Sequence, residues 1–142
     1  MDEQTASRHL TIRASPRLVQ EIAALAKRRG MAPTALARAY LEEGVRLERF
    51  PGIVFRNHVQ ERLAGLAGRR ADVWQVVETF RAEDGDVAAT ADYLQLRPDQ
   101  VRTAIGYAAA YPEEIEALID ENRQAALRLE DAEARQRALL KR

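Results

Sequence analysis

The sequence predicts a mainly α-helical protein. An N-terminal strand-helix-helix unit pairs with a second copy through its strand, and a helical bundle with a small β-hairpin follows. Three observations lead to this prediction. Residues 8–14 alternate polar with apolar side chains, as a half-buried strand does. From Pro16 onward, most apolar residues recur at helical spacing. With 142 residues, the chain has room for one ordinary domain or two very small ones.

Two helices follow the predicted strand, and local signals mark their ends. Ser15 is a good N-cap, Pro16 suits the first helical position, and Gly30 ends the run of helical spacing. Pro33 starts a second helix, which continues to the break at residues 50–52, Phe-Pro-Gly. The sequence therefore predicts two helices joined by a short turn.

The predicted strand at residues 8–14 has no partner strand inside its own unit. Backbone donors and acceptors of a strand need partners, and the apolar side, which carries Leu10 and Ile12, needs cover. A second copy of the chain supplies both if the two strands pair about a two-fold axis as an intermolecular antiparallel β-ribbon. We therefore expect an obligate homodimer.

The rest of the chain predicts a hairpin and then a bundle. Residues 53–56 and 62–65 are strand candidates, and the segments 73–80, 87–94 and 101–109 have helical periodicity, with Asp86 and Pro98 as start signals. A charged helix begins at Glu113, and beyond about Leu129 its apolar stripe is too sparse for a core, so this end is either free in solution or waiting for a partner. Three parts are expected: residues 1–50, 51–122 and a charged tail, 123–142. Five aromatic residues are expected in the core: Trp74, Phe80, Tyr93, Tyr107 and Tyr111.

Charge is segregated along the chain, although the formal net charge is zero. Residues 1–82 hold 14 Lys or Arg against 9 Asp or Glu, residues 83–122 hold 2 against 10, and residues 123–142 hold 6 against 3. A polyanion is attracted to the first block and repelled by the second. The chain is therefore expected to present two kinds of surface.

Several function classes lack the residues they need. The chain has no Cys, no His-x-x-x-His pair for zinc and no phosphate-binding Gly loop, and its two histidines, His9 and His58, lie on different units. We therefore expect no enzyme, no metal site and no cofactor. No apolar stretch reaches the roughly 20 residues that cross a bilayer, which favours a soluble, cytoplasmic protein without membrane contact.

The unit at residues 8–49 resembles the ribbon-helix-helix family of DNA-binding proteins. The matching features are the alternating strand, the Pro at the start of the first helix, the break at Gly30 and a second helix rich in Ala and Leu. The resemblance implies that paired strands enter the major groove of duplex DNA and that their polar side chains contact base edges. At the matching positions this chain has His9, Thr11 and Arg13. An arginine can donate two hydrogen bonds to O6 and N7 of guanine.

The same resemblance implies a phosphate clamp at the start of the second helix, where backbone N–H groups and the positive helix end attract an anion. The turn here is Ala32-Pro33-Thr34-Ala35. The family often has Ser or Thr where Ala32 stands, and Pro33 has no N–H, so the clamp would depend on Thr34 and the amide of Ala35. The ordinary alternative for all these residues is a solvated polar face.

A second motif lies at residues 91–105, where the apolar spacing is similar to a helix-turn-helix with Gln95 at the turn position that Gly usually occupies. The candidate recognition helix would present Asp99, Gln100, Arg102 and Thr103 inside the acidic block. Because a DNA reader needs a basic outer face, we prefer a protein-facing role for this module.

Residues 51–120 resemble a domain of unknown function that is common in VapB-type antitoxins. The residues that carry this resemblance are Pro51-Gly52-Ile53-Val54-Phe55-Arg56, Gly68-Arg69-Arg70-Ala71-Asp72-Val73-Trp74, Leu96-Arg97-Pro98-Asp99-Gln100-Val101 and Tyr111-Pro112-Glu113-Glu114-Ile115. The resemblance implies a cognate toxin protein, a PIN-like ribonuclease, as partner. A nuclease presents a basic groove to RNA, and an acidic surface could occupy it. The candidate partner-binding residues are Glu113, Glu114, Glu116, Asp120 and Glu121.

Together these features predict an antitoxin of a type II toxin-antitoxin pair that also represses transcription at a duplex DNA operator. One alternative is a stand-alone repressor whose C-terminal bundle binds a ligand or promotes oligomerisation. A second alternative is a structural or inhibitory protein that never binds DNA. Steep weakening of duplex binding between low and moderate salt would count against the second alternative.

Overall fold

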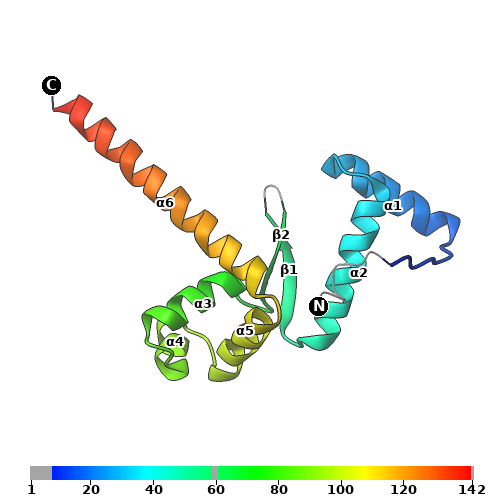
Figure 1. Ribbon diagram of the computed structural model, residues 1–142, viewed down its shortest axis with the longest axis horizontal. Coiled ribbons are helices and arrows are strands. Elements are labelled where there is room, and N and C mark those ends of the chain that lie inside the picture. The colour runs from blue at the N-terminus through cyan, green and yellow to red at the C-terminus, as the bar shows by residue number, and fades with distance from the viewer. Residues whose placement is uncertain (1–7, 59–60, 142) are drawn as a thin grey trace. The chain divides into compact units, whose positions relative to one another are not determined.

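The computed structural model describes residues 8–58 and 61–141 (Figure 1). It divides into two compact units, one ending at Gly44 and the other beginning at Val45. Within the described residues there are six helices and one two-stranded sheet, so the prediction of a mainly helical chain with a small hairpin is confirmed. No helix in this part of the chain is both long and apolar enough to cross a bilayer.

The first unit contains α1 (Pro16–Arg29) and most of α2 (Pro33–Arg49). The Ser15 hydroxyl oxygen accepts a hydrogen bond from the backbone N–H of Leu18 at 3.2 Å, and Pro16 occupies the first turn. Gly30 closes α1 in the left-handed region, at φ 64°, which favours glycine. The predicted signals at both ends of α1 are thus confirmed.

Residues 8–15 lie outside the helices and strands of this single chain and are exposed. Leu10 is 77% exposed and Ile12 is 59% exposed. Because the predicted ribbon needs a strand from a second copy, one chain alone does not test it. The apolar side of the predicted strand is therefore left in solvent here.

Few apolar side chains of the first unit are buried. Among its described residues, only Ala26 and Leu36 are buried, at 0% and 1% exposed. Six larger apolar residues of the same unit are exposed: Leu10, Ile12, Leu18, Val19, Met31 and Leu41. Since helices need tertiary packing of an apolar face to be stable in water, two buried residues are a small core for two helices.

The second unit begins with a β-hairpin. Strands β1 (Ile53–Asn57) and β2 (Arg62–Leu66) pair antiparallel, with Ile53 opposite Leu66. Four helices follow: α3 (Val73–Ala82), α4 (Val87–Leu94), α5 (Pro98–Ala110) and α6 (Pro112–Leu140). The predicted start signals are confirmed, because the Asp86 side chain accepts from the backbone N–H groups of Ala88 and Ala89 in the first turn of α4, and Pro98 is the first residue of α5.

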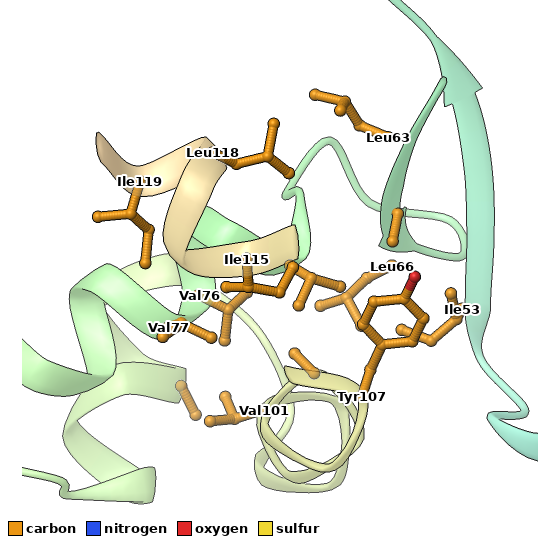
Figure 2. Close-up of a cluster of buried hydrophobic side chains, with 14 residues drawn as sticks. Ile53, Leu63, Leu66, Val76, Val77, Val101, Tyr107, Ile115, Leu118 and Ile119 are labelled. Carbon is orange, nitrogen blue, oxygen red and sulfur yellow. The ribbon is translucent and has the colours of Figure 1, made fainter. Parts of the chain in front are cut away.

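One core unites the hairpin with α3, α4, α5 and the start of α6 (Figure 2). Tyr107 is its largest fully buried side chain, and the Tyr107 ring makes T-shaped contacts with the rings of Phe50 and Phe55. Trp74, Phe80 and Tyr111 pack partly buried against the core, as predicted, whereas Tyr93 is 71% exposed and its prediction was wrong. The other members of the core are Ile53, Leu63, Ala64, Leu66, Val73, Val76, Val77, Ala91, Val101, Ala104, Ile115, Leu118 and Ile119.

Helix α6 belongs to the core only at its start. Ile115, Leu118 and Ile119 are buried, but every residue from Asp120 to Leu140 is exposed. Leu129, on the predicted apolar stripe, is 62% exposed. The charged tail is thus a continuation of α6 rather than a separate folded part, and its sparse stripe makes no core.

Helices α4 and α5 are joined by a three-residue turn, residues 95–97. Gln95 caps α4 in the left-handed region at φ 55°, the conformation for which Gly is usual at this position. The backbone N–H of Leu96 donates to the Ala91 carbonyl oxygen at 2.8 Å and closes the turn. A helix, turn and helix thus occupy the predicted positions even though the turn residue has a side chain.

Candidate nucleic-acid and partner interfaces

The residues predicted to contact base edges, His9, Thr11 and Arg13, all lie in the exposed segment before α1. Their alternation with Leu10 and Ile12 places the three on one side whenever the segment is extended. The segment leads directly into the Ser15 cap. Only Ala14 and Ser15 separate Arg13 from Pro16, the first residue of α1, so Arg13 stays close to the start of that helix. The polar row is therefore free to contact a ligand in this chain.

The candidate phosphate clamp is at the start of α2. The Leu36 N–H donates to the Ala32 carbonyl oxygen at 3.1 Å, which makes Ala32 the residue that opens the helix. The first turn of a helix leaves its N–H groups without intrahelical acceptors, and the Ala32 side chain has no atom that could accept from Thr34 or Ala35. Both residues are exposed. The helix end therefore suits an external anion.

Two of the five acidic residues predicted to bind a partner form ion pairs inside the second unit. Glu114 accepts from Arg46 at 2.5 Å and from the Tyr107 hydroxyl at 2.9 Å, and the Arg46 guanidinium lies 4.0 Å from the centroid of the Tyr111 ring. Burial, together with the neighbouring Glu114 carboxylate, raises the pKa of Tyr107 well above its ordinary value. Glu114 thus acts first as a structural residue that holds the last turn of α2 and the core tyrosine.

Glu116 forms the second internal pair, a two-point contact with the Arg81 guanidinium at the end of α3. Hydrogen bonding from Arg81 lowers the pKa of the exposed Glu116 carboxyl. Glu113, Asp120 and Glu121 are exposed. Glu113 and Asp120 are seven residues apart on α6 and so share one face of the helix. The acidic surface that remains for a partner is therefore formed by Glu113, Asp120 and Glu121.

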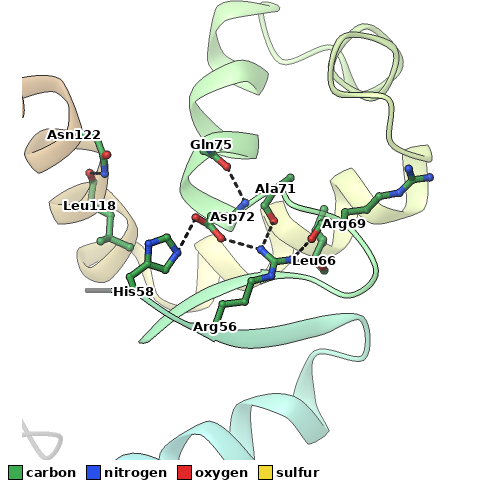
Figure 3. Close-up of polar contacts among 9 residues, drawn as sticks. All are labelled: Arg56, His58, Leu66, Arg69, Ala71, Asp72, Gln75, Leu118 and Asn122. Atoms are coloured by element: carbon green, nitrogen blue, oxygen red, sulfur yellow. Dashed lines mark hydrogen bonds and ion pairs between the residues drawn. The ribbon is translucent and has the colours of Figure 1, made fainter. Parts of the chain in front are cut away.

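A polar cluster around Arg56 was not predicted from the sequence (Figure 3). The Arg56 guanidinium donates to Asp72 Oδ1 at 2.9 Å, to the Ala71 carbonyl oxygen at 3.2 Å, and to the carbonyl oxygens of Leu66 and Arg69. The other oxygen of Asp72 lies 3.4 Å from His58 Nε2, and the Asp72 side chain is only 8% exposed. The cluster therefore ties the hairpin to the start of α3.

Gly65 makes room for this arrangement, because a Cβ at this position would collide with the Arg56 guanidinium. Arg56 and Asp72 are 16 residues apart, so no helical or strand periodicity relates them. The sequence signal that could have identified the cluster is a lone arginine on a short strand, opposite a turn that ends in an N-cap aspartate.

The candidate recognition helix of the second motif, α5, presents a mixed surface. Arg97 donates to both carboxylate oxygens of Asp99, at 3.0 and 3.1 Å, and this contact lowers the pKa of Asp99. Arg102 is exposed, and Gln100 and Thr103 are partly exposed. Because Arg97 is already paired with Asp99, Arg102 is the one arginine within residues 95–110 that remains for phosphates, and α5 offers little positive charge.

Comparisons with family models, with curated proteins and with solved structures found no match for this chain. Within residues 8–58 and 61–141, no group of three or more His, Asp or Glu side chains converges as a metal site would. The function of the chain is therefore inferred from its own residues.

Proposed function

We propose that this protein is a homodimeric, DNA-binding transcriptional repressor and the antitoxin of a type II toxin-antitoxin pair. In this proposal the first unit binds a duplex operator, and the acidic start of α6 binds a ribonuclease toxin of the PIN-like class. The observation that carries the DNA-binding part is the first unit's combination of a very small core, exposed apolar residues at 10 and 12, and an alternate row of polar residues.

Pairing of two copies explains this combination. Two antiparallel strands would satisfy each other's backbone groups and bury Leu10 and Ile12 against the helices. The opposite side of the ribbon would then present His9, Thr11 and Arg13 twice, related by the two-fold axis. A two-stranded ribbon fits the major groove, in which each base pair has a distinct pattern of donors and acceptors.

Replacing Arg13 by Ala tests this part of the proposal. We expect Arg13→Ala to weaken operator binding by about 1–3 kcal/mol for each half-site, because a bidentate contact with guanine is lost. The probe is the duplex that the unaltered protein selects from a random library, and binding is measured by fluorescence anisotropy. The matched control is Arg128→Ala, which removes the same charge from the exposed part of α6. Equal affinities for the unaltered protein and Arg13→Ala would refute the assignment.

A second variant separates lost contacts from lost folding. Ala32→Asp adds a side-chain acceptor at the start of α2, which should stabilise the helix by about 1 kcal/mol. The same carboxylate would occupy the amides of Thr34 and Ala35 and repel phosphate, so operator binding should weaken while the thermal midpoint rises. Ala32→Asn, which caps without charge, shows how much of the loss is due to repulsion.

The toxin-binding part is supported by the exposed carboxylates Glu113, Asp120 and Glu121, which lie in the acidic block. A ribonuclease must attract RNA phosphates with a basic groove, and a rigid helix that carries carboxylates on one face can compete for that groove. Glu114 and Glu116 contribute indirectly, because their partners Arg46 and Arg81 hold the start of α6 in place.

Charge reversal tests the toxin-binding surface. The double variant Glu113→Lys and Asp120→Lys should weaken inhibition of the ribonuclease encoded by the adjacent gene at least 10-fold, because two attractive contacts become repulsive. Ribonuclease activity on a fluorogenic RNA is the readout. The matched control is Glu130→Lys with Glu133→Lys, farther along the exposed part of α6. If the two double variants inhibit equally, this surface is not the toxin contact.

A further inference from the structure

The turn between β2 and α3 combines positive charge with exposure. Its residues 67–70, Ala-Gly-Arg-Arg, are all exposed, and neither Arg69 nor Arg70 has an ion-pair partner among the residues that the structure describes. Gly68 is in the left-handed region at φ 70°, and a Cβ built on it would meet no atom within 4 Å. The tip of the turn is therefore open to an approaching ligand.

The backbone of this turn is held from inside by Arg56. The guanidinium of Arg56 donates to carbonyl oxygens before, within and after the turn, those of Leu66, Arg69 and Ala71. The turn is also closed by its own backbone, since Leu66 N–H donates to the Ala71 oxygen at 3.0 Å and Arg69 N–H to the Leu66 oxygen at 3.2 Å. Figure 3 shows the Arg69 side chain directed away from this cluster. A turn fixed in this way loses less entropy on binding than a mobile loop.

The charge around the turn favours an anionic ligand. The neighbouring carboxylate, Asp72, is buried and already pairs with Arg56 and His58, so it does not offset the two exposed arginines. Most acidic residues of the second unit lie in the segment 83–122 instead. Arginine is the side chain best suited to phosphate, because its planar fork donates two parallel hydrogen bonds.

We propose that Arg69 and Arg70 form a second contact with nucleic-acid phosphates. Both arginines lie in the second unit, whose helix-turn-helix-like motif offers no basic face of its own. This inference rests on the DNA binding proposed above and extends it to the second unit. Because the contact is with the phosphate backbone, it adds affinity and salt dependence but no sequence preference.

The test is the salt dependence of duplex binding by the full chain. Each phosphate contact that is lost reduces the slope of log K against log salt concentration by about 1. We expect Arg69→Gln with Arg70→Gln to reduce the slope by about 2 for each chain that engages the duplex, and to weaken selected and random 30-base-pair duplexes by the same factor. Arg69→Lys with Arg70→Lys should keep most of the slope, because the charges remain.

Four outcomes overturn the inference, and they are distinguishable. An unchanged slope for the Gln variant refutes the turn contact while leaving the proposed function intact. An equal loss for Arg128→Gln with Arg135→Gln, two exposed arginines of α6, would assign the effect to overall charge. Failure of the unaltered chain to bind duplex in a salt-dependent way refutes the proposed function and this inference together. If the Gln variant keeps its slope but no longer inhibits the ribonuclease, the turn is a protein contact.

Discussion

Ile12→Glu is expected to raise the dissociation constant of the dimer at least about 100-fold. In the proposed ribbon each copy buries one Ile12 side chain, and burying an isoleucine contributes about 1.5–3 kcal/mol, so the loss is counted twice per dimer. The new carboxylate would also have to be desolvated. Sedimentation equilibrium over a range of protein concentrations measures the change, and far-ultraviolet circular dichroism reports whether α1 and α2 lose helix on dissociation.

Thr11→Glu is the matched control, because it places the same charge on the neighbouring residue but on the polar side of the predicted ribbon. It should leave the dimer intact while it weakens DNA binding through repulsion of phosphates. Two results would contradict the ribbon: a dimer that Ile12→Glu leaves unchanged, or a well-folded single subunit of the unaltered protein at micromolar concentration.

The helices could be predicted because their signals are local. A cap, a proline and a glycine lie within or next to α1 and mark its ends. Asp86 marks the start of α4 and Pro98 the start of α5. The exposure of Tyr93 was also predictable in principle. On α4, Val87, Thr90, Ala91 and Leu94 are among the buried or partly buried residues and follow helical spacing, and residue 93 lies off that stripe.

The long-range polar contacts of the second unit could not be predicted, because they join residues far apart in the sequence. Arg46 and Glu114 are 68 residues apart, and Arg81 and Glu116 are 35 apart. Periodicity shows which residues share a face but not which charges meet after folding. Glu114 also lies one turn before Leu118, at the edge of the buried stripe of α6, which is a weak local sign that it would point toward the core. For this reason the folded chain is needed to show which of the five predicted acidic residues form internal ion pairs and which remain exposed for a partner.

Arg56→Met is expected to lower the free energy of unfolding of the second unit by about 3–5 kcal/mol, a large share of the 5–15 kcal/mol that is typical of a domain. The methionine keeps the volume of the arginine stem, but the buried Asp72 carboxylate would lose its arginine partner and keep its contact with His58. The carbonyl oxygens of Leu66, Arg69 and Ala71 would each lose a donor as well. Urea unfolding followed by the fluorescence of Trp74, the single tryptophan, reports on this unit alone.

Two further variants show whether the loss arises from the Asp72 pair. Arg62→Met removes an arginine from the neighbouring strand that donates to Asn57 Oδ1 and, partly buried, to the Phe55 carbonyl oxygen, but leaves no carboxylate buried without its partner, so it should cost about 1 kcal/mol. Arg56→Met combined with Asp72→Asn should cost less than the sum of the two single changes, because the second change removes the unpaired carboxylate. Additive losses, or equal losses for the Arg56 and Arg62 variants, would mean that the Arg56 cluster does not hold the turn. In that case the rigid presentation of Arg69 and Arg70 would lose its physical basis, since the backbone hydrogen bonds alone would have to fix the turn.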